Sequence, residues 1–102
     1  MQHKWTNACK GDVKRASAIS VLMDKHPALI DWMFREDKPE LKASPGQILK
    51  RAGAFSTGEK ILIQLALDIW SGDGATKILD LDRLDPGNFK NALSAIELMR
   101  GI

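Results

Sequence analysis

Three residues in the chain could ligate a soft metal ion through sulfur or imidazole nitrogen. They are His3, Cys9 and His26. Structural zinc sites use three or four such ligands, usually brought together as close C-x-x-C or H-x-x-x-H pairs. The sequence contains neither pair. We therefore expect no metal site and no cofactor.

Two further patterns fail the same test of spacing. Asp80, Asp82 and Asp85 lack the oxygen ligand and the glycine that a calcium loop needs at its fifth and sixth positions. The run Gly72–Lys77 contains two glycines and a lysine, as a phosphate-binding loop does. Such a loop needs four residues between its glycines and Ser or Thr after its lysine, and it follows a strand. We interpret the aspartates as a solvated acidic face and the run Gly72–Lys77 as a turn between two helices.

Covalent catalysis finds equally little support. Cys9 is the one cysteine, and it lies in a polar N-terminal segment without a feature that would activate a thiol as a nucleophile. No serine stands in the G-x-S-x-G pattern of a nucleophile elbow. The sequence therefore predicts a protein that is not an enzyme.

Large apolar side chains are more abundant than a small core strictly needs. Four of them indicate a candidate partner surface: Trp32, Met33, Phe34 and Trp70. Exposed clusters of this kind mark surfaces for protein association, whereas the same residues buried would simply be core. We favour a small non-enzymatic module for protein–protein interaction, of the accessory or adaptor type. Its partner would be another protein or a second copy of this chain.

Positive charge is concentrated in the first half of the chain. Residues 1–51 carry ten Lys and Arg against six Asp and Glu, whereas residues 52–102 carry five against seven. Five of the basic residues could contact phosphate groups: Lys10, Lys14, Arg15, Lys50 and Arg51. Weak nucleic-acid binding through this patch is the alternative function, although the excess charge is smaller than nucleic-acid-binding domains usually show.

Length and composition indicate one soluble domain. A chain of 102 residues can bury a core that needs neither metal nor disulfide, and a single cysteine fits a reducing compartment. The first ten residues lack the apolar region of a signal peptide, and no uncharged apolar run approaches the ~18 residues of a membrane span. We predict a cytoplasmic protein without a membrane partner.

The segment that must organise the rest of the chain is residues 57–71. Its Ile, Leu, Ala and Trp residues cover most of a helical wheel, at about 100° per residue. Its inner polar positions form one narrow ridge: Lys60, Gln64 and Asp68. Ser56 and Glu59 form the S-x-x-E capping box that precedes a helix, and Gly72 follows the last turn. We expect a helix buried on most of its circumference.

Shorter helices are expected around this segment. Their predicted ranges are 13–25, 27–35, 47–52, 75–84 and a final helix from Pro86 to about residue 99. Pro27 should break or kink the chain near His26, and Ser44-Pro45 starts either a helix or a type II turn. The final helix shows a clear apolar stripe: Phe89, Ala92, Leu93, Ile96 and Met99.

No segment alternates apolar and polar residues long enough to propose a strand. The sequence therefore predicts an all-α fold, a compact bundle of five to six short helices around the central helix. Residues 1–10 should form a loose N-terminal segment and residues 11–102 a single helical domain. A helix-turn-helix reader of DNA is disfavoured, because its second helix would be residues 57–71, which offer bases only one narrow polar ridge.

Overall fold

The computed structural model describes residues 13–35, 40–71 and 76–99. The helices within these ranges are α2 (Val13–Leu22), α3 (Pro27–Met33), α4 (Pro45–Arg51), the 3-10 helix η2 (Ala52–Ala54), α5 (Thr57–Ser71), α6 (Ile78–Leu81) and α7 (Pro86–Met99). In this part of the chain the one extended pairing is an isolated antiparallel bridge between Phe34 and Leu41. The all-α prediction is confirmed. No helix of the described residues is long and apolar enough to cross a membrane.

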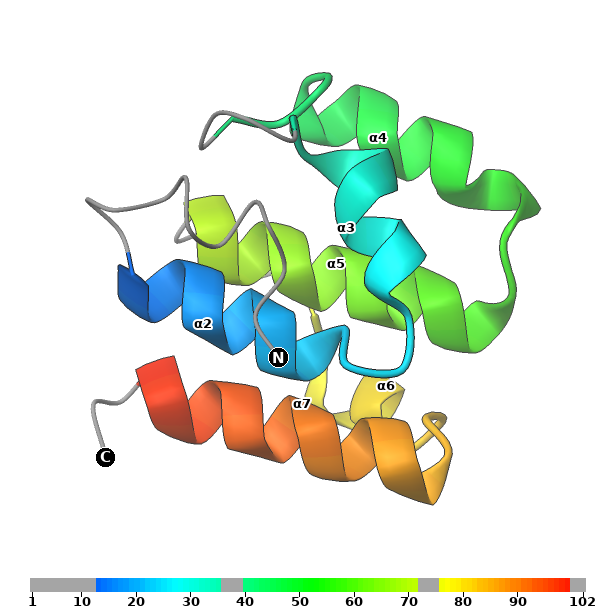
Figure 1. Ribbon diagram of the computed structural model, residues 1–102. Helices are drawn as coiled ribbons and strands as arrows, with labels where there is room; N and C mark the ends of the chain where they lie inside the picture. The colour runs from blue at the N-terminus through cyan, green and yellow to red at the C-terminus, as the bar shows by residue number, and fades with distance from the viewer. Residues whose placement is uncertain (1–12, 36–39, 72–75, 100–102) are drawn as a thin grey trace.

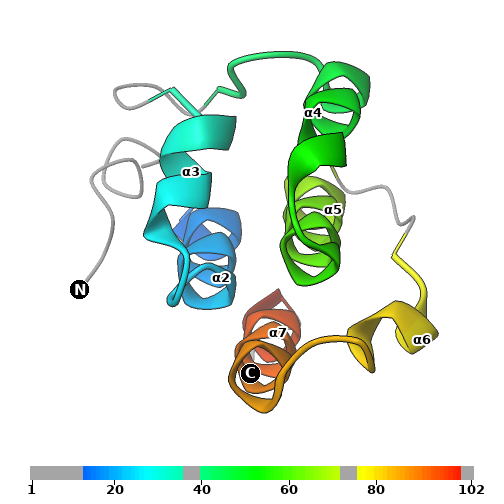
Figure 2. The ribbon, with the colours of Figure 1, turned by 90° about the vertical axis from the view of Figure 1, so that its right-hand side faces the viewer.

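Three helices form the centre of the molecule. Figure 2 shows α2, α5 and α7 end-on at the corners of a triangle, with α3 stacked above α2 and α4 above α5. Helix α2 runs in the opposite direction to α5 and α7 (Figure 1). It packs against both of them, so the three together enclose the core.

Helix α5 occupies the range that the sequence predicts. The Ser56 hydroxyl accepts a hydrogen bond from the Glu59 backbone N–H at 3.2 Å, and Glu59 Oε1 accepts one from the Ser56 backbone N–H at 3.2 Å. Its buried residues are Ile61, Leu62, Ile63, Leu65, Ala66, Leu67 and Ile69. The prediction of a central helix buried on most sides is confirmed, and its N-terminal capping box is present.

Pro27 separates two helices and does not merely kink one. Helix α2 ends at Leu22, before the predicted end at Lys25, and a turn follows. His26 then adopts a non-helical backbone conformation, with φ −136° and ψ 56°, and Pro27 occupies the first position of α3. This conformation follows from the clash that a proline ring makes with a helical residue before it.

The two short helices α4 and α6 differ in how well the sequence predicts their starts and lengths. Ser44 caps α4 through a reciprocal pair of 3.3 Å hydrogen bonds with Gln47, so the segment starts a helix and not a type II turn. The predicted helix over residues 75–84 is too long, because α6 covers only Ile78–Leu81. The Asp80 carboxylate accepts the Lys77 backbone N–H at 3.1 Å and so caps this single turn.

Helix α7 buries a face that shares Ala92 with the predicted stripe but is turned away from Phe89 and Leu93. The buried residues are Asn88, Ala92 and Ala95. Phe89 and Leu93 border this face and are 38% and 44% exposed. The buried alanines let α7 lie close to α2, whose own buried face includes Ala16 and Ile19. A face of small side chains therefore makes the contact that the larger apolar residues were expected to make.

Candidate functional site

The four residues of the predicted partner surface divide into two groups. Met33 and Phe34 are buried, with exposures of 0% and 1%. Trp32 and Trp70 are half-buried and pack against the core. Met33 and Phe34 therefore act as core residues in the folded chain and offer a partner no surface, which leaves the two tryptophans as candidates.

The two tryptophans stand in separate aromatic pairs. The Trp32 ring meets Phe55 edge to face, with centroids 4.9 Å apart and planes at 86°. The Trp70 ring meets Phe34 in the same way, at 5.2 Å and 74°. Because Phe34 is buried and Phe55 is half-buried, the Trp70 pair continues into the core, whereas the Trp32 pair lies at the surface.

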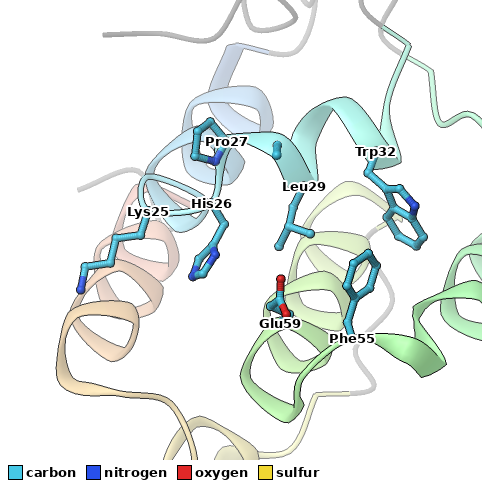
Figure 3. A pocket seen from close by; sticks show the side chains of 8 residues that line it. Lys25, His26, Pro27, Leu29, Trp32, Phe55 and Glu59 are labelled. Carbon is cyan, nitrogen blue, oxygen red and sulfur yellow. The ribbon is translucent and has the colours of Figure 1, made fainter.

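A pocket of about 390 Å³ lies beside the Trp32–Phe55 pair. It is lined by Lys25, His26, Pro27, Ala28, Leu29, Trp32, Phe55 and Glu59. Helix α3 and the turn before it supply one wall, and the start of α5 supplies the other (Figure 3). We call this the α3–α5 pocket. Its volume falls at the lower end of the range of ligand pockets, roughly 300–1,000 Å³, and most of its lining is apolar.

Glu59 provides the carboxylate among the lining residues. Its Oε1 accepts hydrogen bonds from the Ser56 hydroxyl at 2.9 Å and from the Ser56 backbone N–H at 3.2 Å. These two bonds, the hydroxyl bond first, hold the pKa of Glu59 below its ordinary value, against a smaller opposing effect of burial. The pocket therefore contains an ionised carboxylate at neutral pH.

The Lys25 side chain is directed at α7 and not at Glu59. Its Nζ lies 4.0 Å from Asp85 Oδ1, and a Cβ added at Gly87 would overlap this ammonium group. Figure 3 shows the Lys25 amine pointing away from Glu59, at the far side of the His26 ring. The Lys25 ammonium group therefore pairs with Asp85, the residue before α7, and not with Glu59.

His26 is held at the pocket rim by a polar network that begins at α7. Asn88 Nδ2 lies 3.2 Å from His26 Nε2 and donates to Asp85 Oδ2 at 3.0 Å. The opposite amide orientation would set Asn88 Oδ1 against a carboxylate oxygen, so we assign Nε2 of His26 as the acceptor and Nδ1 as the protonated nitrogen. Asn88 Oδ1 is buried and has no hydrogen-bond partner among the described residues.

Two of the predicted phosphate contacts lie at the start of α2. Lys14 is exposed. Arg15 is half-buried, and its Nη1 donates to the backbone carbonyl of Trp70 at 2.8 Å. The last carbonyls of a helix have no partner within the helix, so Arg15 satisfies one of them at the end of α5. Lys10 lies outside the described residues.

The other two predicted phosphate contacts, Lys50 and Arg51, are exposed in the last turn of α4. Figure 1 shows this turn at the opposite side of the molecule from the start of α2. The described basic residues therefore do not form one continuous patch. Nucleic-acid binding stays a prediction that these observations do not test.

A second, smaller pocket is more polar and has mixed charge. It measures about 240 Å³ and is lined by Thr57, Lys60, Ile61, Gln64, Thr76, Asp80 and Arg83. Elsewhere in the described ranges, no group of three or more His, Cys, Asp and Glu side chains could hold a metal ion. His3 and Cys9 lie outside those ranges. The α3–α5 pocket is therefore the stronger candidate for a binding site.

Comparison of the chain with protein-family models, with curated proteins and with solved structures finds no match in any of the three. The function therefore has to be inferred from the geometry of this pocket.

The sequence pattern indicated Trp32 as a candidate binding residue but not three of its neighbours in the pocket, Leu29, Phe55 and Glu59. One signal could have found Phe55. It stands immediately before the N-cap Ser56, where a hydrophobic residue often packs on the fourth residue of the helix. That residue is Lys60, so Phe55 must find its apolar partner in another element, and it finds Trp32.

Proposed function

We propose that the protein is a small non-enzymatic module that binds another protein by accepting a side chain of that partner in the α3–α5 pocket. The observation that supports this most is the Trp32–Phe55 pair, which is half-buried at the edge of a mostly apolar pocket. Aromatic side chains around a small pocket are typical anchors of protein interfaces.

The pocket alone supports a weak complex. Burying one large apolar side chain contributes about 1.5–3 kcal/mol. Association costs at least about 4 kcal/mol in lost translational and rotational freedom. The partner must therefore also contact the protein surface around the pocket, and we expect a peptide segment and not an isolated side chain to be the unit that is recognised.

Selection from a library of displayed peptides tests this proposal. Peptides enriched on the wild-type protein should lose about tenfold in affinity, or 1.4 kcal/mol, when Trp32 is changed to leucine. The matched control is Trp70→Leu. Both variants remove a half-buried indole from an edge-to-face pair, but only Trp32 lines the pocket.

Affinity for the Trp70→Leu variant should stay within about twofold of the wild-type value, which is the usual effect of a change outside an interface. Failure to enrich any peptide, or an equal loss in both variants, would show that the α3–α5 pocket is not where a partner binds.

A further inference from the structure

The carboxylate of Glu59 is the charge that faces a ligand in the α3–α5 pocket. Figure 3 shows it between the His26 ring and the Phe55 ring, opposite the side chain of Leu29. Both hydrogen bonds from Ser56 end on Oε1, and Oε2 takes part in neither. One carboxylate oxygen is therefore open to a group that enters the pocket.

The other two polar residues of the lining do not neutralise this oxygen. Lys25 Nζ lies beside Asp85 and over Gly87. His26 Nε2 accepts from Asn88 in the orientation assigned above. The pocket thus combines apolar walls with a negative charge, which complements a ligand that has an apolar stem and a positive end.

We propose that the partner residue which enters the α3–α5 pocket is a lysine, with its aliphatic stem against Leu29 and Trp32 and its ammonium group at Glu59 Oε2. This proposal rests on the proposed function. A lysine stem packs on apolar surface while its head keeps its charge, and aromatic rings attract a cation at their faces. An ammonium group on a carboxylate oxygen makes a charge-assisted hydrogen bond.

The capping box favours lysine over arginine. A guanidinium group binds a carboxylate best through two parallel hydrogen bonds, one to each oxygen. Oε1 of Glu59 already accepts from Ser56 twice. The single remaining oxygen suits a compact ammonium group better than a planar fork.

Three synthetic versions of one peptide enriched on the wild-type protein test the proposal on the full chain: they carry lysine, norleucine or arginine at the position whose contribution to affinity depends on Trp32. Each is titrated into the ¹⁵N-labelled protein, and binding is followed through the backbone amide shifts of the pocket residues. Norleucine has the lysine stem without the charge. Because a partly exposed ion pair is worth only a fraction of a kcal/mol to about 1 kcal/mol, lysine should bind about three- to fivefold more tightly than norleucine.

In the variant Glu59→Gln, the affinity ratio of lysine to norleucine should fall to about one, because the variant lacks the carboxylate charge that attracts the lysine ammonium group. Glutamine at this position can still complete the capping box, so the variant keeps the start of α5. Glu97→Gln, an equal change of charge at an exposed position of α7, should leave the preference for lysine intact.

Three results would overturn the lysine assignment: norleucine or arginine binding as tightly as lysine, a preference that survives in Glu59→Gln, or no probe shifting the pocket residues. If norleucine alone binds, the pocket still accepts an apolar side chain and the proposed function stands. The proposed function itself fails on the peptide selection, through its dependence on Trp32, and not on these titrations.

Discussion

At the scale of single residues, Ser56 and Glu59 serve two purposes. Their S-x-x-E spacing predicts the start of α5, and the reciprocal hydrogen bonds confirm it. The same pairing fixes the Glu59 carboxylate in the wall of the α3–α5 pocket. The cap could be predicted because its two residues are close in sequence. The pocket could not, because it forms only where α3 packs beside the start of α5.

Two carboxylates should make stability depend on pH. The pKa of Glu59 is lowered by Ser56, and the pKa of Asp85 is lowered chiefly by the backbone N–H of Asn88, which donates to it at 2.8 Å. Both groups bind protons more tightly when the chain is unfolded. Their stabilising contribution is therefore complete above the unfolded pKa values of about 4.3 for Glu and 3.9 for Asp, and is lost as the pH falls through the lower folded values.

Denaturant unfolding at a series of pH values from about 2 to 7 measures this dependence. The free energy of unfolding should fall as the pH drops below about 4.3. The double variant Glu59→Gln, Asp85→Asn should show a smaller fall over the same range. An unchanged slope in the double variant would mean that other groups carry the acid sensitivity.

At the scale of helices, α7 shows where pattern reading fails. The stripe predicted one face, and the fold buries an adjacent face that overlaps it at Ala92. Asn88 is buried there because Asp85 and the His26 ring satisfy its amide nitrogen. A hydrophobic pattern ranks residues by size and polarity, so it cannot show that alanines, being small, allow the close contact with α2.

Paired substitutions in α7 distinguish the two faces. Ala95→Leu inserts a larger side chain into a fully buried position outside the predicted stripe and should cost about 1–3 kcal/mol. Leu93→Ala removes a partly exposed side chain and should cost less than about 1 kcal/mol. Thermal or denaturant unfolding of each variant measures both values. A larger loss for Leu93→Ala than for Ala95→Leu would restore the predicted stripe as the buried face.

Helix starts with a local signature are predicted better than helix ends, although the predicted helices 47–52 and 75–84 begin two residues late and three residues early. Three helices begin with a proline at the first position: Pro27, Pro45 and Pro86. Each start has a signature in its own residues, because proline fixes its backbone angle and lacks the N–H that a first turn leaves unpaired. The early ends of α2 at Leu22 and of α6 at Leu81 have no such signature. These two helix ends depend on where the chain has to change direction so that the next helix can pack against the core.

At the scale of the whole molecule, the all-α class and the central place of α5 follow from the sequence, because a helix apolar on most sides must be covered. The division between Trp32 and Trp70 does not follow from it. Both are tryptophans among apolar residues, and their difference arises from their partners, the half-buried Phe55 and the buried Phe34. Those partners come from distant parts of the chain, and so does the pocket.

The indole N–H signals of the ¹⁵N-labelled protein, followed during titration with an enriched peptide, test most directly whether the α3–α5 pocket is the binding site. The chain has three tryptophans, and spectra of the Trp32→Leu and Trp70→Leu variants assign the signals of these two. The Trp32 indole should shift progressively to saturation while the Trp70 indole stays in place, because only Trp32 lines the pocket. A shift of Trp70 without one of Trp32 would contradict this assignment and move the binding surface to the other end of α5.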